Sequence, residues 1–145
     1  MKGSRRNSRE LALQGLYQWL VNQTEADEIL AQAAEQDGFA RCDREYLEML
    51  VRSVIRDGEQ LREQVSPLLD RPIGQLSPVE HALLLMAASE LVSQPEIPYR
   101  VIINEAVELA KVYGGTDGHK YVNGVLDKLA TSLRPLEPTQ RKRKA

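Results

Sequence analysis

Three arginines stand close together near the start of the chain, where their guanidinium groups can bind phosphate. Arg5, Arg6 and Arg9 crowd the beginning of a segment with helical spacing, and the first acidic residue is Glu10. Cations at the positive end of a helix dipole cost stability, typically ~0.3–1 kcal/mol each. A phosphate offsets that cost, because guanidinium groups and the free N–H groups of a first helical turn both bind it. The pattern indicates an anion-binding start, with a solvated and partly disordered terminus as the alternative.

A second candidate surface is the glycine-rich stretch at residues 113–121. Tyr113 and Tyr121 flank it, Lys120 stands beside the second tyrosine, and Asp117 is placed to begin a helix. Aromatic rings, a cation and free helix N-terminal amides are the groups that bind unstacked RNA bases and their phosphates. Tyr113 can equally close a hydrophobic core at a helix end, so both interpretations of this residue stay open.

Charge is segregated along the chain. Lys and Arg number 19 against 21 Asp and Glu, and eight of the 19 lie at the two ends. A polyanion is attracted to those ends and repelled by the acidic remainder, so nucleic-acid binding must be localised. The basic run at residues 141–144 is expected to be a flexible tail that adds non-specific attraction. The acidic body also suits a basic protein partner.

Motifs of metal and nucleotide enzymes are absent from the sequence. It contains no phosphate-binding glycine loop, no nucleophile elbow and no HExxH, and its two histidines, His81 and His119, stand far apart. Glu105 and Glu108 share one helix face, but Lys111 three residues further on favours an ordinary solvated face with an ion pair. We therefore expect no catalysis, no cofactor and no metal site.

The elements that must position these residues are helices, because helical spacing of apolar residues runs through the chain without sustained strand alternation. We expect the first helix to start near Ser8, with Asn7 and Glu10 as a cap pair and Tyr17 on its inner stripe. The second is expected to start at Thr24 and the sixth to begin at a capping Asp117. The expected helices cover residues 8–22, 24–38, 43–66, 77–91, 99–114 and 117–133.

The middle of the chain predicts its organisation. The helix that follows Ser77-Pro78 is apolar almost all round from Ala82 to Leu91, so we expect it at the buried centre. Gly114 is expected to end the next helix in the left-handed conformation. Proline and glycine punctuate residues 69–74, which divides the chain into an N-terminal subdomain (1–70), a C-terminal subdomain (71–135) and a basic tail (136–145).

Several stretches of the sequence are similar to the NusB family. INEAVELAK at residues 103–111 and HKYVNGVLDK at residues 119–128 resemble its signature, as do residues 5–10 and 16–19 at the start. The resemblance implies an all-α fold of two small three-helix-type subdomains packed together, without catalysis. Members of this family pair with the ribosomal protein NusE and bind boxA RNA. Within the RNA polymerase antitermination complex, with other Nus factors, they promote processive transcription of ribosomal RNA operons.

The resemblance also assigns residues. Its implied surface for NusE includes Tyr17 and Glu80. The implied RNA contacts are Lys2, Arg5, Arg6, Arg9, Asp117, Lys120 and Tyr121.

Two other functions stay open alongside this one. A NusB-like helical domain also occurs fused before RNA cytosine methyltransferase modules as an RNA-binding appendage, and a purely protein-binding adaptor would use the acidic surface without RNA. The free protein can be a monomer or a homodimer, because an apolar helix face serves a core or an interface equally well. We expect a cytoplasmic protein without membrane contact, since no apolar run approaches the ~18 residues needed to cross a bilayer and no signal peptide is recognisable.

Overall fold

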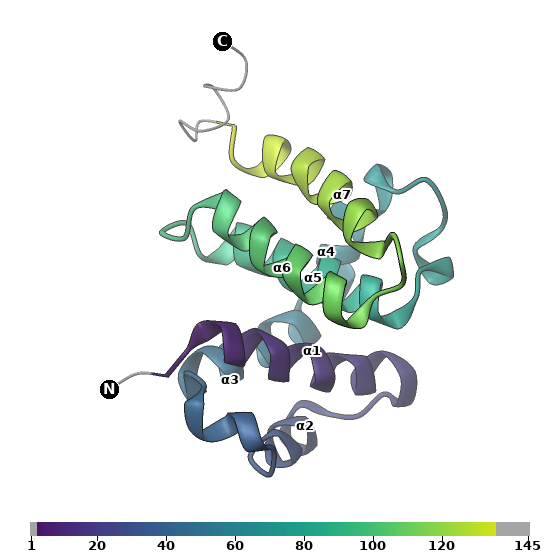
Figure 1. The fold of residues 1–145 in the computed structure, drawn as a ribbon. Coiled ribbons are helices and arrows are strands. Elements are labelled where there is room, and N and C mark those ends of the chain that lie inside the picture. The colour runs from purple at the N-terminus through teal and green to yellow at the C-terminus, as the bar shows by residue number, and fades with distance from the viewer. Residues whose placement is uncertain (1–2, 136–145) are drawn as a thin grey trace.

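The structure is a computed structural model that describes residues 3–135, and within this range the chain is all-helical, as predicted (Figure 1). Lys2 and the tail at 136–145 lie outside the described residues. The α-helices are α1 (Arg5–Asn22), α2 (Ala26–Ala33), α3 (Arg44–Arg56), α4 (Gly58–Val65), α5 (Pro78–Ser93), α6 (Tyr99–Tyr113) and α7 (Gly118–Leu133). Short 3-10 helices are η1 (Asp37–Arg41), η2 (Ser66–Leu68) and η3 (Ile73–Gln75).

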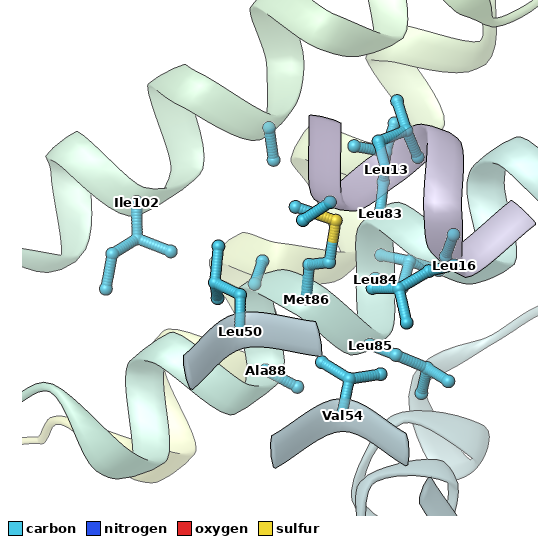
Figure 2. Close-up of a cluster of buried hydrophobic side chains, with 14 of the residues drawn as sticks. Leu13, Leu16, Leu50, Val54, Leu83, Leu84, Leu85, Met86, Ala88 and Ile102 are labelled. Carbon is cyan, nitrogen blue, oxygen red and sulfur yellow. The ribbon is translucent and has the colours of Figure 1, made fainter. Parts of the chain in front are cut away.

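Helix α5 is the centre of the molecule. The Ser77 side chain caps it by accepting a hydrogen bond from the Glu80 amide at 3.1 Å, and every residue from 82 to 91 is buried, which confirms the prediction. Helices α1, α3 and α4 pack against it, and so do α6 and α7. Burying each leucine side chain of such a helix stabilises the fold by roughly 1.5–3 kcal/mol. Figure 2 shows this packing around Leu13, Leu16, Leu50, Val54, Leu83, Leu84, Leu85, Met86 and Ile102.

The predicted third helix is two helices. Helix α3 ends at Arg56 and α4 begins at Gly58, because Asp57 leaves the helical conformation with φ −102° and ψ 16°. The ring of Trp19 packs against Gly58, where a Cβ atom would lie 3.1 Å from it. The apolar positions of both helices stay buried on either side of the break, so their spacing could not reveal it.

Other helix ends also differ from the predictions. Helix α1 begins three residues earlier than expected because Ser4, rather than Asn7, is its cap. Helix α2 begins at Ala26 without a side-chain cap, so Thr24 does not have the predicted role. Gly114 has φ −87° and is not left-handed; glycine is needed there because a Cβ atom would lie 2.7 Å from the Ala110 carbonyl oxygen.

One hydrophobic cluster joins the two halves of the described chain. It contains side chains of α1, α3 and α4 together with those of α5, α6 and α7. The segment at residues 69–74 crosses the surface between these groups, as expected for a punctuated connection. Within residues 3–135, no helix is long and apolar enough to cross a membrane.

Candidate functional site

The start of α1 is fastened to the segment before α3. The Ser4 amide donates to the Arg41 carbonyl oxygen at 2.7 Å, and the Asp43 amide donates to the Ser4 carbonyl oxygen at 3.2 Å. The Ser8 hydroxyl donates to the Asp43 carbonyl oxygen at 2.7 Å and accepts from the Asp43 amide at 2.9 Å. Gly3 fits only as glycine, since a Cβ atom would overlap the Cys42 carbonyl group. From Gly3 onward the arginines therefore project from an ordered backbone.

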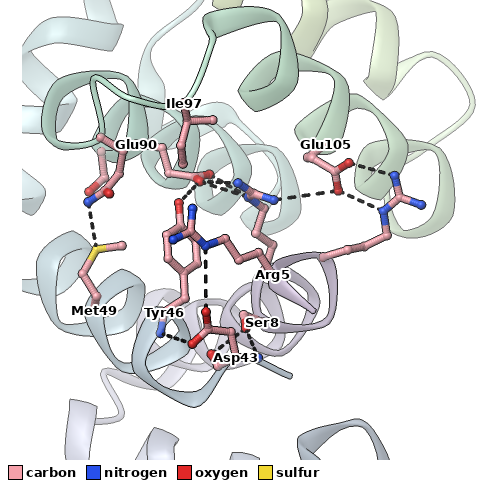
Figure 3. A network of polar contacts seen from close by, with 12 residues as sticks. Arg5, Ser8, Asp43, Tyr46, Met49, Glu90, Ile97 and Glu105 are labelled. Atoms are coloured by element: carbon pink, nitrogen blue, oxygen red, sulfur yellow. Dashed lines mark hydrogen bonds and ion pairs between the residues drawn. The ribbon is translucent and has the colours of Figure 1, made fainter. Parts of the chain in front are cut away.

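Arg5 and Arg6 lie on the surface at this start. The Arg6 guanidinium donates two hydrogen bonds to Glu105 of α6, Nε to Oε1 at 3.0 Å and Nη2 to Oε2 at 2.8 Å, while 68% of its side chain stays exposed. These bonds from Arg6 hold the pKa of Glu105 below its usual value. The Arg5 guanidinium lies 4.4 Å from the ring centroid of Tyr46 and its Nε lies 3.9 Å from Asp43 Oδ2. Figure 3 shows these contacts as one network.

Arg9 lies inside the protein, unlike an exposed contact residue. Only 6% of its side chain is exposed, and its Nη2 donates to Glu90 Oε2 at 2.7 Å while its Nε donates to the same carboxylate at 3.0 Å. The Tyr46 hydroxyl also donates to Glu90, and burial together with the Glu90 charge raises the pKa of Tyr46. Arg9 shares a face of α1 with Arg5, but it lies one turn further from the helix start, where its side chain reaches Glu90 of α5. Its guanidinium is not available to a ligand while the pair with Glu90 is intact.

The second predicted group lies at the start of α7. Asp117 precedes the helix but makes no capping hydrogen bond; its carboxylate pairs instead with Lys120, Nζ to Oδ1 at 3.6 Å, and both side chains are exposed. The Tyr121 hydroxyl donates to Asp70 Oδ1 at 3.0 Å. The guanidinium of Arg71 lies over the Tyr121 ring, 4.6 Å from its centroid. This group therefore includes two residues of the connection between the halves.

Helix α6 contacts α1 at two points. At its middle, Glu105 contacts Arg6; at its end, the Tyr113 hydroxyl donates to Glu10 and accepts from Gln14 Nε2 at 3.3 Å. Tyr113 lies eight positions after Glu105, which is about 12 Å along the helix. Tyr113 is 37% exposed, so it does not close the core, and the open interpretation is decided in favour of a surface position.

The two residues assigned to a protein partner lie on one face. Tyr17 is 37% exposed, so the prediction that it lies on the inner stripe of α1 is wrong. Its side chain lines an apolar pocket of about 250 Å³ together with Val79 and Tyr113. Glu80 follows Val79, and its carboxylate approaches Gly118, where a Cβ atom would lie 3.1 Å from Glu80 Oε2. The partner face thus adjoins the start of α7.

Sequence reasoning missed the acidic partners of the arginines. Glu90 gave a signal, since a single charge in an otherwise apolar stretch needs a buried counter-charge. Glu105 gave none, because its spacing to Glu108 suits a solvated face; the predicted pair of Glu108 with Lys111 is confirmed at 3.2 Å. The sequence places Arg71 in the connection at residues 69–74 and indicates no contact for it. No cluster of metal-binding side chains occurs among the residues that the structure describes.

The sequence is similar to those of known proteins over nearly its whole length. The NusB family model matches residues 6–131. The chain is 58% identical over 144 residues to the transcription antitermination protein NusB of Paraburkholderia phytofirmans, covering 99% of each chain. It is 59% identical over 141 residues to the protein of the same name from Burkholderia cenocepacia, covering 97% of each.

Solved structures are similar as well. NusB of T. maritima superposes with a TM-score of 0.81 at 26% identity over 100% of both chains. A chain from a crystal structure of the antitermination factors NusB and NusE in complex with dsRNA superposes with a TM-score of 0.77 at 25% identity, covering 88% of this chain and 96% of that one.

Proposed function

The chain belongs to the NusB family, and on this premise we propose that it is a transcription antitermination factor which binds boxA RNA as a heterodimer with the ribosomal protein NusE. It acts by binding and performs no catalysis. It works in the cytoplasm, with RNA polymerase and other Nus factors, to promote processive transcription of ribosomal RNA operons. The domain boundaries at residues 70 and 135 stay predictions.

The observation that carries the RNA part is the fastened start of α1. Arg5 and Arg6 are held on an ordered backbone with 42% and 68% of their side chains exposed, and Lys120 and Tyr121 lie at the start of α7. Phosphate contacts position an RNA and make its affinity depend on salt, while rings and guanidinium planes stack its unpaired bases. We assign Arg5, Arg6, Lys120 and Tyr121 to the RNA surface. Arg9 serves it indirectly, by holding α1 against α5.

The partner face supports the heterodimer. Tyr17 and the pocket it shares with Val79 offer an apolar contact, and Glu80 adds a carboxylate at the edge that adjoins α7. Aromatic side chains at a pocket are typical anchors of protein interfaces. A partner seated there lies beside the start of α7, so it can contact RNA bound at Asp117 and Lys120. Linkage then requires NusE to raise the RNA affinity.

The test is fluorescence anisotropy of a labelled boxA RNA and of a scrambled RNA, with and without purified NusE, across a salt series. We expect preference for boxA that strengthens with NusE. Arg6→Ala lowers the affinity and reduces the salt slope by roughly one. Arg56→Ala is the matched control, since Arg56 is an exposed arginine paired with an adjacent aspartate. Equal, weak binding to both RNAs, unmoved by NusE and by Arg6→Ala, excludes the proposal and favours a protein-binding adaptor.

A further inference from the structure

Arg71 and Tyr121 form a layered pair on the surface at the start of α7. The guanidinium lies 4.6 Å from the ring centroid, so it covers one face of the ring. Asp70 holds both members: Arg71 Nε donates to Asp70 Oδ1 at 2.8 Å, and the Tyr121 hydroxyl donates to the same oxygen at 3.0 Å. The Asp70 amide in turn donates to the Tyr121 hydroxyl oxygen at 3.4 Å. Asp70 therefore holds the Arg71 guanidinium over the Tyr121 ring.

This geometry changes what Tyr121 can do. A base that stacked directly on the covered face of its ring would have to displace Arg71 and break the bond to Asp70. A base can instead stack on the Arg71 guanidinium, because 42% of the Arg71 side chain is exposed. Among residues 3–135, Tyr121 is the only ring and Asp70 the only ion-pair partner that contacts it. Arginine planes stack unpaired RNA bases as aromatic rings do.

We infer that Arg71 is a base-stacking residue of the RNA surface: an unpaired RNA base stacks on the outer face of its guanidinium, and Tyr121 and Asp70 position that guanidinium from beneath. The inference rests on the proposed RNA-binding function and extends it to a residue of the 69–74 connection. Lys120 lies next to Tyr121 in sequence and is 74% exposed, so it is placed to hold the phosphate of the stacked nucleotide. Tyr121 is then a positioning residue.

The experiment uses the full chain with NusE and labelled single-stranded boxA RNA, in intact form and with each nucleotide in turn made abasic. Arg71→Ala is expected to weaken binding of the intact RNA roughly fivefold or more, which is the scale of one lost stacking contact. One abasic position costs the wild type affinity but costs Arg71→Ala nothing further, because the contact is already absent. Arg71→Lys keeps the charge and the salt slope but loses the stacking plane, so it binds about as weakly as Arg71→Ala.

The control is Arg56→Ala, because Arg56 makes the same kind of ion pair with a neighbouring aspartate but does not lie over an aromatic ring of residues 3–135. It is expected to leave the affinity and the abasic profile unchanged. The inference is overturned if Arg71→Ala behaves like this control, or if Arg71→Lys binds like the wild type, which assigns Arg71 a phosphate contact. If Arg71 stacks no base but the proposed function is correct, Arg6→Ala still binds boxA RNA more weakly than the wild type. If the wild type shows no preference for boxA and Arg6→Ala binds RNA like the wild type, the proposed function is excluded as well.

Discussion

Glu105 binds the Nε and Nη2 edge of the Arg6 guanidinium, the edge at which an RNA phosphate would also bind. Both hydrogen bonds, at 3.0 and 2.8 Å, follow the paired geometry that arginine adopts with carboxylates and phosphates alike. RNA bound at Arg6 must therefore replace an internal anion. The displaced carboxylate keeps a counter-charge, because Arg9 Nη1 lies 4.0 Å from Glu105 Oε1.

Glu105→Gln is expected to raise the affinity for boxA RNA by up to about fivefold, the scale of one exposed charge pair. The gain is expected to vanish when Arg6→Ala is combined with it, since no guanidinium is then released. Glu59→Gln is the control: its carboxylate pairs with Arg62 on α4, which packs near the far end of α1 at Trp19. Anisotropy measures all four variants. A gain that persists without Arg6 would trace the effect to general charge removal.

Glu90→Gln is expected to destabilise the protein by about 3–5 kcal/mol, because it leaves the buried Arg9 guanidinium without a counter-charge. Urea unfolding followed by circular dichroism measures the change. Replacing the group together, as Arg9→Met, Tyr46→Phe and Glu90→Leu, is expected to recover most of the loss, since no buried polar atom is then unpaired. A triple variant no more stable than Glu90→Gln would contradict this.

Stability is expected to fall as the pH is lowered from 6.5 to about 4, because of His81. Burial, and then the charge of Arg62, lowers the pKa of His81 from 6.5 to about 4. Arg62 Nε donates to His81 Nε2 at 3.1 Å, so protonation would remove the acceptor. Between these pH values the unfolded chain binds the proton and the folded chain does not, which favours unfolding; below about pH 4 both bind it.

His81→Gln isolates that contribution, since its amide oxygen can still accept from Arg62. We expect the urea midpoint of the variant to change less than that of the wild type over this window. The two proteins are expected to show a constant difference above pH 7. If the urea midpoints of the two proteins run parallel over the whole pH range, His81 has the same pKa in the folded and unfolded chains, which contradicts the prediction.

Gly15→Ala is expected to cost roughly 1–3 kcal/mol, the range for overpacking a tight contact. A Cβ atom at this position would collide with Ile29 Cγ2, so the Ile29 side chain or α2 itself must shift. Thermal unfolding measures the loss. Gly124→Ala on α7 is the control, because its Cβ would meet nothing within 4 Å. Combining Gly15→Ala with Ile29→Ala, which removes the colliding methyl, should cost less than the sum of the single changes.

The fold was largely predictable because apolar spacing determines where helices lie, whereas Asn7, Thr24 and Asp117 do not have the predicted capping roles. Ser77, Pro78 and the apolar run to Leu91 identified the central helix correctly. The break at Asp57 was not predictable, since the apolar spacing continues through it and the buried positions lie on both sides. Tyr17 followed helical spacing yet is exposed, because the inner face of α1 is set by the packing of several helices.

The candidate site was predictable in its cations and not in its anions. The position of Arg5, Arg6 and Arg9 predicts a phosphate-binding start; in the structure Arg5 and Arg6 are exposed there and Arg9 is buried. Their partner Glu105 lies 99 residues from Arg6 in sequence, so only the packing of α6 beside α1 identifies it. The contact of Arg71 with Tyr121 has the same origin. Pairing between distant helices is a tertiary property that local patterns do not encode.

The sharing of one core between the two halves has a consequence for the connection at residues 69–74. Without their covalent link, the halves would be two subunits of an obligate dimer, and the link acts by raising the effective concentration of one around the other. Lengthening such a tether costs only about 0.6 kcal/mol per doubling. This segment is constrained by the packing of Leu69 and Ile73 against the core and by the contacts of Asp70 and Arg71 with Tyr121, so its length can change only where these residues keep their positions.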